Sequence, residues 1–284
     1  MVAVTHISDP ADRRLDDFRA VREPELAASR GLFIAEGRLV VRRLLTESRL
    51  ATRSVLVTPS ARQAVEDVMP SRPDLEVYVA PQDVMNTVTG FNIHRGCLAT
   101  GVRPATTGWR ELATHARRLV ILEHVGDADN VGAIFRSAAA FDADGVLIGP
   151  TCADPLYRKA IRTSMGAALT LPFAYLEPWP AALYELTNDG WAVAALTPTA
   201  DAVPLHDFAA SSHERVALAV GHEGTGLSEE ALRAANYHVR IPIRAAVDSL
   251  NVAAAAAIAL YEVTVGRVPR AAAATDGDPA NRNR

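Results

Sequence analysis

Residues 119–150 read LVILEHVGDADNVGAIFRSAAAFDADGVLIGP and contain two apolar runs on either side of a helical pattern. The runs LVILEHV (119–125) and GVLIGP (145–150) have the length of buried strands, whereas residues 130–142 carry apolar residues at helical spacing. Two parallel strands need a crossover connection between them, and a helix is the usual one. This stretch therefore predicts a βαβ unit and an α/β fold.

The same alternation continues toward residue 266. Further strands are predicted at 169–176, 191–198, 215–221 and 237–243, and further helices at 155–168, 179–189, 228–236 and 249–266. Strands that are apolar on both sides belong to sheets covered on both faces. We therefore expect a mostly parallel sheet with helices on both faces.

A second, smaller α/β region precedes this one. Its predicted strands are 54–58, 75–80 and 97–102, and its predicted helices are 39–50 and 60–69. The stretch PATTGWRELATHAR (104–117) differs in character from both regions. The expected organisation is an N-terminal domain (1–104), a linker (105–117), a C-terminal domain (118–268) and a small polar, disordered tail (269–284).

The composition excludes several classes of protein. The chain has 284 residues, of which 49% are hydrophobic and 22% charged, so it can bury a sizeable core. No apolar run reaches the roughly 18 residues of a membrane span, and the N-terminus lacks the pattern of a secretory signal. Cys97 and Cys152 are isolated thiols without metal-ligand spacing. We expect a soluble, cytoplasmic protein that binds no metal.

The single lysine, Lys159, excludes further activities. It is not preceded by the glycine-rich turn that a phosphate-binding loop or a kinase requires. His222-Glu223 is followed by Gly-Thr-Gly, so the zinc motif H-E-x-x-H is absent. Ser164 lacks a nucleophile elbow, because Arg162 stands where that motif has glycine.

Charge alone leaves nucleic-acid binding open. The net charge of −4 and the pI near 6.1 are unlike those of most nucleic-acid-binding domains. In residues 1–65, however, arginines outnumber acidic residues. An ion-paired, solvated surface is the simplest interpretation of this excess.

In a parallel sheet, ligands bind at the carboxyl ends of the strands, so the loops after the strands are the candidate sites. In the first such segment (123–141), Asp129 or Asn130 is expected to cap a helix. Gly132 within the first turn is unfavourable for a helix unless another chain segment or a ligand approaches closely. Arg136 follows on the same helix face among apolar residues. A capped helix whose arginine extends to solvent is the structural alternative.

The second segment, AVGHEGTGLSEEAL (219–232), has glycines at 221, 224 and 226 and a helix that Ser228 is expected to cap. The glycines would let the backbone curl around a ligand, although a tight turn would need them too. Their spacing, G-x-x-G-x-G, differs from the dinucleotide fingerprint.

The third segment, RIPIRAAVDSLNVAAAAAIALYE (240–262), begins an alanine-rich helix that Ser249 could cap. Asn251 in its first turn is a poor helix former unless its amide has a partner. Simple capping and core packing remain an alternative explanation.

Taken together and in this order, the three segments resemble the motifs of the SpoU (TrmH) family of RNA ribose methyltransferases. The motifs read NVGAIFRS (130–137), GHEGTGLS (221–228) and IPIRAAVDSLNV (241–252). The resemblance covers about 118–266, and residues 9–103 are more loosely similar to the substrate-binding domain that many members carry.

The resemblance implies a trefoil-knotted sheet, a homodimer and S-adenosylmethionine as methyl donor. It places the cofactor against Leu196, Thr197, Gly221, Ile241 and Leu250. The acceptor would be a ribose 2′-hydroxyl in structured RNA, with ribosomal RNA favoured over tRNA.

The resemblance also implies the catalytic group. Because a guanidinium stays protonated, Arg136 would bind an RNA phosphate and polarise the attacking hydroxyl. Asn130 would orient Arg136 and the ribose, Glu223 would hold Arg136 or the loop, and Ser249 and Asn251 would complete the pocket.

The chain departs from the family pattern at a few positions. His222 replaces the usual asparagine, Ala245-Ala246 a glycine, and Ala253 a frequent serine. His94-Arg95 is a possible RNA contact. Two other classes remain: a non-catalytic RNA-binding or ribosome-assembly protein on the same fold, and a nucleotide-dependent enzyme on a Rossmann-like sheet.

Overall fold

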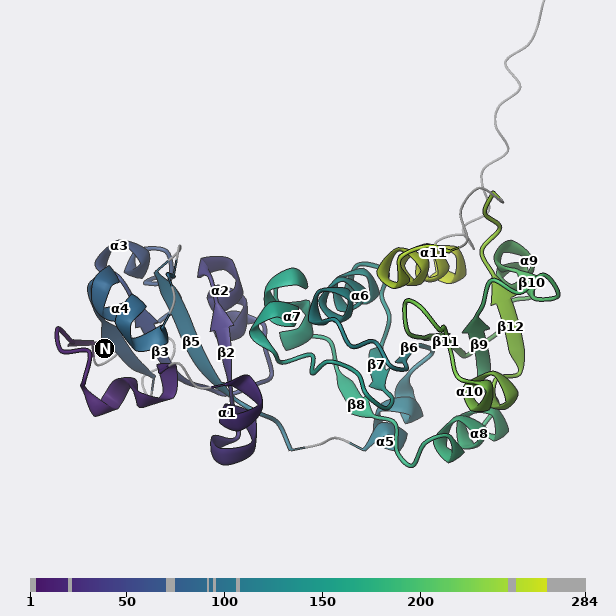
Figure 1. Ribbon diagram of the computed structural model, residues 1–284, viewed down its shortest axis with the longest axis horizontal. Coiled ribbons are helices and arrows are strands. Elements are labelled where there is room, and N and C mark those ends of the chain that lie inside the picture. The colour runs from purple at the N-terminus through teal and green to yellow at the C-terminus, as the bar shows by residue number, and fades with distance from the viewer. Residues whose placement is uncertain are drawn as a thin grey trace, which may run out of the picture.

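The computed structural model describes residues 4–19, 22–69, 75–90, 92–93, 96–105, 108–244 and 249–264. The chain forms two α/β units that lie side by side along its longest axis (Figure 1). His94-Arg95, Ala245-Ala246 and the tail from 269 lie outside the described residues.

The N-terminal unit is built on a five-stranded sheet in the order β1-β4-β3-β5-β2. Its strands are β1 (Val4–His6), β2 (Leu32–Glu36), β3 (Thr52–Val57), β4 (Glu76–Val79) and β5 (Cys97–Val102). Strands β1, β4 and β3 are parallel, whereas β5 runs antiparallel to both β3 and β2. The sequence predicted β3, β4 and β5 but not the two edge strands.

Short helices cover this sheet: η1 (Arg13–Phe18, a 3₁₀ helix), α1 (Glu23–Arg30), α2 (Arg38–Thr46), α3 (Pro59–Arg62) and α4 (Gln82–Thr89). Helix α2 buries Val40, Val41, Leu44 and Leu45, which share one face of the helix. The helices predicted at 39–50 and 60–69 are shorter here, since α2 ends at Thr46 and α3 at Arg62.

The C-terminal unit contains a seven-stranded, entirely parallel sheet in the order β10-β12-β9-β11-β6-β7-β8. Its strands are β6 (Arg118–Leu122), β7 (Gly145–Ile148), β8 (Phe173–Tyr175), β9 (Ala192–Leu196), β10 (Val203–Pro204), β11 (Val216–Val220) and β12 (Tyr237–Arg240). The central strands β6 and β11 are almost wholly buried. The predicted parallel sheet is confirmed, with β10 as an unpredicted edge strand.

Helices cover both faces of this sheet, as expected. One face packs against α6 (Ala128–Ala140), α9 (Leu205–Ala210) and α11 (Val252–Thr264). The other packs against α5 (Trp109–His115), α8 (Ala181–Asn188) and α10 (Glu229–Ala234). The knot implied by the resemblance stays a prediction. None of the described helices is long and apolar enough to cross a membrane.

Two stretches differ in local structure from the sequence predictions. Residues 105–117, expected to be a linker, contain α5, whose Trp109 is buried and donates its indole N–H to the carbonyl of Glu177 at 2.8 Å. The helix predicted at 155–168 is divided into α7 (Arg158–Thr163) and the 3₁₀ helix η2 (Ala167–Leu169). It breaks because Met165 and Gly166 adopt positive φ angles of 53° and 85°.

The two units share part of a hydrophobic core. Leu156, Ile161 and Leu169, from around α7 and η2, are buried in the same cluster as the apolar face of α2 and the N-terminal sheet. Arg103 and Asp154 form an ion pair across the same junction. The N-terminal unit is therefore packed against the α7 region of the C-terminal unit rather than tethered to it.

Candidate active site

The three motif segments converge at one edge of the C-terminal sheet. Strands β6 and β11 are neighbouring and parallel, so the loops after them, leading to α6 and α10, leave the sheet at the same edge. Residues 249–251 precede α11, which packs against both α6 and β11. Segments more than 100 residues apart in sequence thus come together.

Hydrogen bonds between three polar side chains connect the three segments. Asn130 donates from Nδ2 to Oε1 of Glu223 at 2.5 Å, and Asn251 donates from Nδ2 to Oδ1 of Asn130 at 3.0 Å. Oδ1 of Asn251 accepts the backbone N–H groups of Ala253 and Ala254 at 3.0 and 3.2 Å. Asn251 therefore caps α11 and holds Asn130 at the same time, which explains an asparagine at this position.

Arg136 stands apart from this network. It is exposed on α6 and forms no hydrogen bond or ion pair with any residue that the structure describes. Glu223, expected to hold either Arg136 or the loop, instead accepts from Asn130. The free guanidinium is available to a ligand from outside the described chain.

Two helix caps differ from the predictions. Helix α6 is capped by Asp127, which accepts the N–H of Asp129 at 3.0 Å, rather than by Asp129 or Asn130. Helix α11 begins at Val252, so Ser249 is exposed before the helix rather than at its cap. In both cases another polar side chain nearby in the sequence, Asp127 for α6 and Asn251 for α11, accepts the N–H groups of the helix start.

The cap predicted at Ser228 is confirmed, and its hydroxyl accepts the N–H of Ala231 at 3.1 Å. The same side chain interacts with Glu123, a buried residue that sequence reasoning missed. Glu123 has 0% exposure at the end of β6 and accepts both the N–H and the hydroxyl of Ser228, at 2.8 and 2.6 Å. A buried carboxylate needs such partners, so this pair fixes the loop after β11 to the end of β6. A lone acid directly after four apolar residues was the available signal.

The motif glycines permit close packing within the protein. A Cβ on Gly132 would lie 2.5 Å from the carbonyl oxygen of Ala160 on α7. A Cβ on Gly221 would lie 2.4 Å from backbone atoms of Gly226 and Leu227, where the loop folds back on itself. Nδ1 of His222 accepts the N–H groups of Gly224 and Thr225 at 3.0 and 3.2 Å, which organises this loop further.

Four of the five residues expected to hold the cofactor lie at the ends of the neighbouring parallel strands β12, β9 and β11, and the fifth, Leu250, lies shortly before α11. Leu196 ends β9, Gly221 follows β11 and Ile241 follows β12. Leu196, Ile241 and Leu250 are half-buried, and the N–H of Thr197 is used in sheet pairing with Val239 at 2.9 Å. Partly exposed aliphatic side chains beside backbone groups suit the flat, apolar face and the polar edge of an adenine ring. These residues fit an adenosine-containing cofactor.

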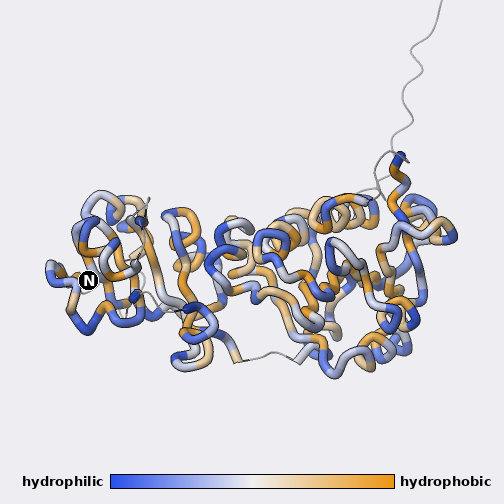
Figure 2. The backbone as a smooth tube through the Cα atoms, viewed as in Figure 1, coloured by the Kyte–Doolittle hydropathy of each residue, from blue (hydrophilic) through white to orange (hydrophobic). Residues whose placement is uncertain are grey.

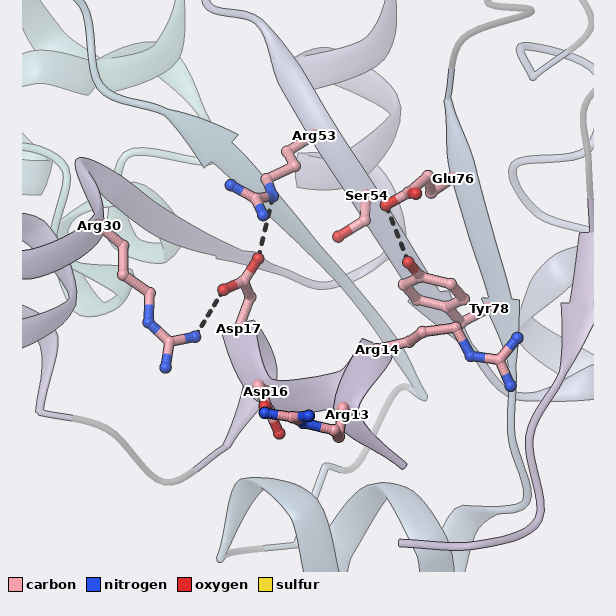
Figure 3. A pocket seen from close by; sticks show the side chains of 9 residues that line it. All are labelled: Arg13, Arg14, Asp16, Asp17, Arg30, Arg53, Ser54, Glu76 and Tyr78. Carbon is pink, nitrogen blue, oxygen red and sulfur yellow. Dashed lines mark hydrogen bonds and ion pairs between the residues drawn. The ribbon is translucent and has the colours of Figure 1, made fainter. Parts of the chain in front are cut away.

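The N-terminal unit has a basic pocket, shown in Figure 3. It has a volume of about 570 Å³ and is lined from η1, α1, β3 and β4 by Arg13, Arg14, Asp16, Asp17, Arg30, Arg53, Ser54, Glu76 and Tyr78. Asp17 lies between two arginines, with 2.6 Å from its Oδ1 to Nη1 of Arg30 and 3.1 Å from its Oδ2 to Nε of Arg53. One carboxylate thus fixes two guanidinium groups.

Two other groups complete the pocket. Arg13 is exposed and has no hydrogen bond or ion pair among the described residues. The hydroxyl of Tyr78 donates to Glu76 at 2.8 Å, and burial together with that carboxylate raises the pKa of Tyr78 to about 12. Tyr78 therefore remains a hydrogen-bond donor at neutral pH.

Comparison with known proteins identifies the class of this fold. The structure of an AdoMet-bound rRNA methyltransferase from Sinorhizobium meliloti superimposes with a TM-score of 0.77 over 93% of this chain and 99% of its own, at 25% identity. The SpoU methyltransferase AviRb from Streptomyces viridochromogenes has the same fold, with a TM-score of 0.78 over 90% of this chain and 99% of its own, at 22% identity. The chain thus shares its two-unit α/β fold with solved methyltransferases.

The sequence comparisons are more specific. The SpoU rRNA Methylase family matches residues 117–261. An uncharacterized tRNA/rRNA methyltransferase of Mycobacterium bovis is 44% identical over 92% of both chains. The 23S rRNA (guanosine(2553)-2′-O)-methyltransferase RlmP of Bacillus subtilis is 27% identical over 90% of this chain and 98% of its own. The chain belongs to the SpoU rRNA methylase family.

Proposed function

We propose that this protein transfers the methyl group of S-adenosylmethionine to the 2′-hydroxyl of a ribose in structured RNA, with ribosomal RNA as the substrate. The observation that carries the proposal is the hydrogen-bonded series Glu223–Asn130–Asn251 at the start of α6. The same helix carries Arg136, which has no hydrogen bond or ion pair among the described residues. This series joins the three motif segments at the edge where parallel sheets bind ligands. The names of the S. meliloti and B. subtilis relatives support the cofactor and the acceptor atom.

The roles of the residues follow from their chemistry. When bound, S-adenosylmethionine supplies a methyl group already activated by its sulfonium. The protein must therefore align a hydroxyl and help to remove its proton, and alignment alone can lower a barrier by several kcal/mol. Arg136 binds the adjacent phosphate and polarises the hydroxyl, whose proton passes to phosphate or water. Asn130, held from both sides, contacts the ribose.

RNA recognition is assigned to the basic pocket of the N-terminal unit. The guanidinium groups of Arg30 and Arg53 are positioned by Asp17, and Arg13 has no protein partner among the described residues. Positioned guanidinium groups suit phosphate, because they donate several hydrogen bonds in a fixed geometry. The pocket is proposed to hold one phosphate of the RNA backbone, away from the methylated ribose.

The proposed active form is a homodimer. Ala254, Ile258 and Tyr261 form one exposed stripe along α11, with Ile258 42% and Tyr261 50% exposed. Tyr261 also packs edge-on against Phe141 at the end of α6, with 5.8 Å between ring centroids. Figure 2 shows α11 as largely apolar along its length. A second copy of the chain would remove this apolar stripe from water.

The decisive experiment is methyl transfer from labelled S-adenosylmethionine to total RNA from cells that lack this protein. Wild type is compared with Arg136→Ala and with Arg233→Ala, which removes another exposed charge, from α10 on the opposite face of the sheet. Label at a ribose 2′-oxygen of ribosomal RNA, lost only with Arg136→Ala, is the expected result. Label in tRNA would show that tRNA, and not ribosomal RNA, is the substrate. Cofactor binding without any label would indicate a non-catalytic RNA-binding protein instead.

A further inference from the structure

Helix α7 lies between the two units and contacts both. On one side, the backbone N–H of Arg158 donates to a carboxylate oxygen of Glu23, and its guanidinium Nε lies 3.6 Å from Oε2 of Glu36. Ile161, one turn later, is buried in the core of the N-terminal unit. These contacts fix α7 to the N-terminal unit.

Lys159, which directly follows Arg158 on α7, interacts with the start of α6 in the C-terminal unit. Its ammonium group lies 3.1 Å from Oδ1 of Asp127 and 3.0 Å from Oδ2 of Asp129, and the hydroxyl of Thr163 donates to Oδ1 of Asp129 at 2.7 Å. Asp127 and Asp129 are the N-cap and first-turn acid of α6. The close contact of Gly132 with Ala160 brings the same turn against α7. Two side chains and one backbone contact of α7 thus hold the beginning of α6.

Lys159 compensates the negative charge of two neighbouring aspartates. The positive end of the α6 dipole stabilises both Asp127 and Asp129, but the two carboxylates repel each other. The N–H of Asp129 and the Lys159 ammonium lower the pKa of Asp127, while the Thr163 hydroxyl and the same ammonium lower the pKa of Asp129. Both carboxylates therefore stay ionised at neutral pH and keep their bonds to the single lysine of the chain.

Asn130 directly follows Asp129. Its amide must reach Glu223 on one side and Asn251 on the other, and both bonds require the first turn of α6 to be in register with two other loops. A displacement of about 1 Å in a catalytic arrangement can lower a rate by as much as 100-fold.

We propose that Lys159 is a positioning residue for methyl transfer: through Asp127 and Asp129 it sets the place of Asn130, and through α7 it links that place to the docking of the N-terminal unit. The proposal rests on the proposed function. It implies that α7 connects the N-terminal unit, which is assigned to RNA binding, with the active site. RNA held by the N-terminal unit would then be presented to an active site whose alignment depends on the same helix.

The test compares Lys159→Met, which keeps the length of the side chain without its charge, with Lys159→Arg, which keeps the charge. Lys159→Met is expected to lower kcat by about 10-fold or more, while KM for RNA, cofactor affinity and the thermal midpoint stay near those of wild type. Lys159→Arg is expected to restore most of kcat. A merely structural lysine would instead lower the thermal midpoint and weaken binding. Wild-type kcat in Lys159→Met would overturn the proposal.

Because the chain has one lysine, amine chemistry provides a second measurement on the unmutated protein. Acetylation removes the charge of Lys159, whereas reductive methylation keeps it. Acetylation is expected to abolish most activity and methylation to leave it. Lys159→Arg treated in the same way reports any effect of the N-terminal amine. Equal activity after both treatments would contradict the proposal, whereas an inactive untreated wild type would contradict the proposed function itself.

Discussion

The side-chain amide of Asn251 donates to Oδ1 of Asn130 at 3.0 Å, across 121 residues of sequence. The same asparagine caps α11 through its oxygen. The start of the last helix and the start of α6 are therefore held by two ends of a single amide group, so any movement of one helix start changes the other.

The two roles of Asn251 can be separated by substitution. Asp at this position still accepts the N–H groups of Ala253 and Ala254, but it cannot donate to Asn130. Asn251→Asp is expected to keep the stability of wild type and to lower kcat by about 10-fold or more, because Asn130 loses its orientation. Asn251→Ala should lose activity and, in addition, about 1 kcal/mol of unfolding free energy. Denaturant titration and methyl-transfer kinetics measure both; full activity of Asn251→Asp would disprove the role of the amide.

Glu123 is expected to be a structural group of the site. Glu123→Ala removes the acceptor of the two hydrogen bonds that Ser228 donates and leaves the partly buried N–H of Ser228 without that partner. The free energy of unfolding should therefore fall by about 2 kcal/mol. Cofactor affinity should fall as well, because the loop that begins at Gly221 loses its attachment to β6. Glu229→Ala, an exposed substitution on α10, is the control. Equal stability of the two variants would show that Glu123 does not hold the loop.

The basic pocket predicts a specific salt dependence. Replacing Arg53 by Ala removes one of the two guanidinium groups on Asp17 and should weaken RNA binding, with the slope of log affinity against log salt reduced by about 1. Cofactor binding should not change. Fluorescence anisotropy at several salt concentrations, with Arg233→Ala as control, measures the slope. An unchanged slope would place the RNA backbone elsewhere.

The stripe on α11 predicts the oligomeric state. Light scattering during size-exclusion chromatography should give twice the mass of the 30.3 kDa chain for wild type. Ile258→Glu places a charge in the centre of the stripe and should give a monomer, because an unpaired charge at an apolar interface is costly. Tyr184→Glu, which alters an exposed aromatic on α8 across the sheet, should remain a dimer. A monomeric wild type would contradict the dimer proposal.

The sequence was most informative where periodicity alone determines structure. The central strands β6, β7, β9 and β11 and the helices between them were predicted from apolar runs and helical spacing. These patterns are local to the sequence and do not depend on which elements pack together. The convergence of Asn130 and Glu223 also followed, since the loops after the adjacent parallel strands β6 and β11 meet at one edge of the sheet. Asn251 follows β12, which is not adjacent to either strand, and reaches the same edge through the packing of α11.

Other features depended on contacts that local patterns do not encode. The sequence predicted Asp129 or Asn130 as the cap of α6, whereas the fold of the loop makes Asp127 the cap. The pairing of Glu123 with Ser228 joins residues 105 positions apart in sequence, and neither residue alone indicates it. Helix α5 lies in a polar stretch, and it packs against the sheet through only two buried residues, Trp109 and Ala113.

The shared core at the junction has a consequence for the modularity of the chain. Leu156, Ile161 and Leu169 belong by sequence to the C-terminal unit but are covered by the N-terminal one. A fragment that starts after residue 105 would present these three side chains to water and would tend to self-associate. The N-terminal unit also cannot be replaced by an unrelated domain unless the surface formed by these three side chains is redesigned. The two units are expected to melt in one transition.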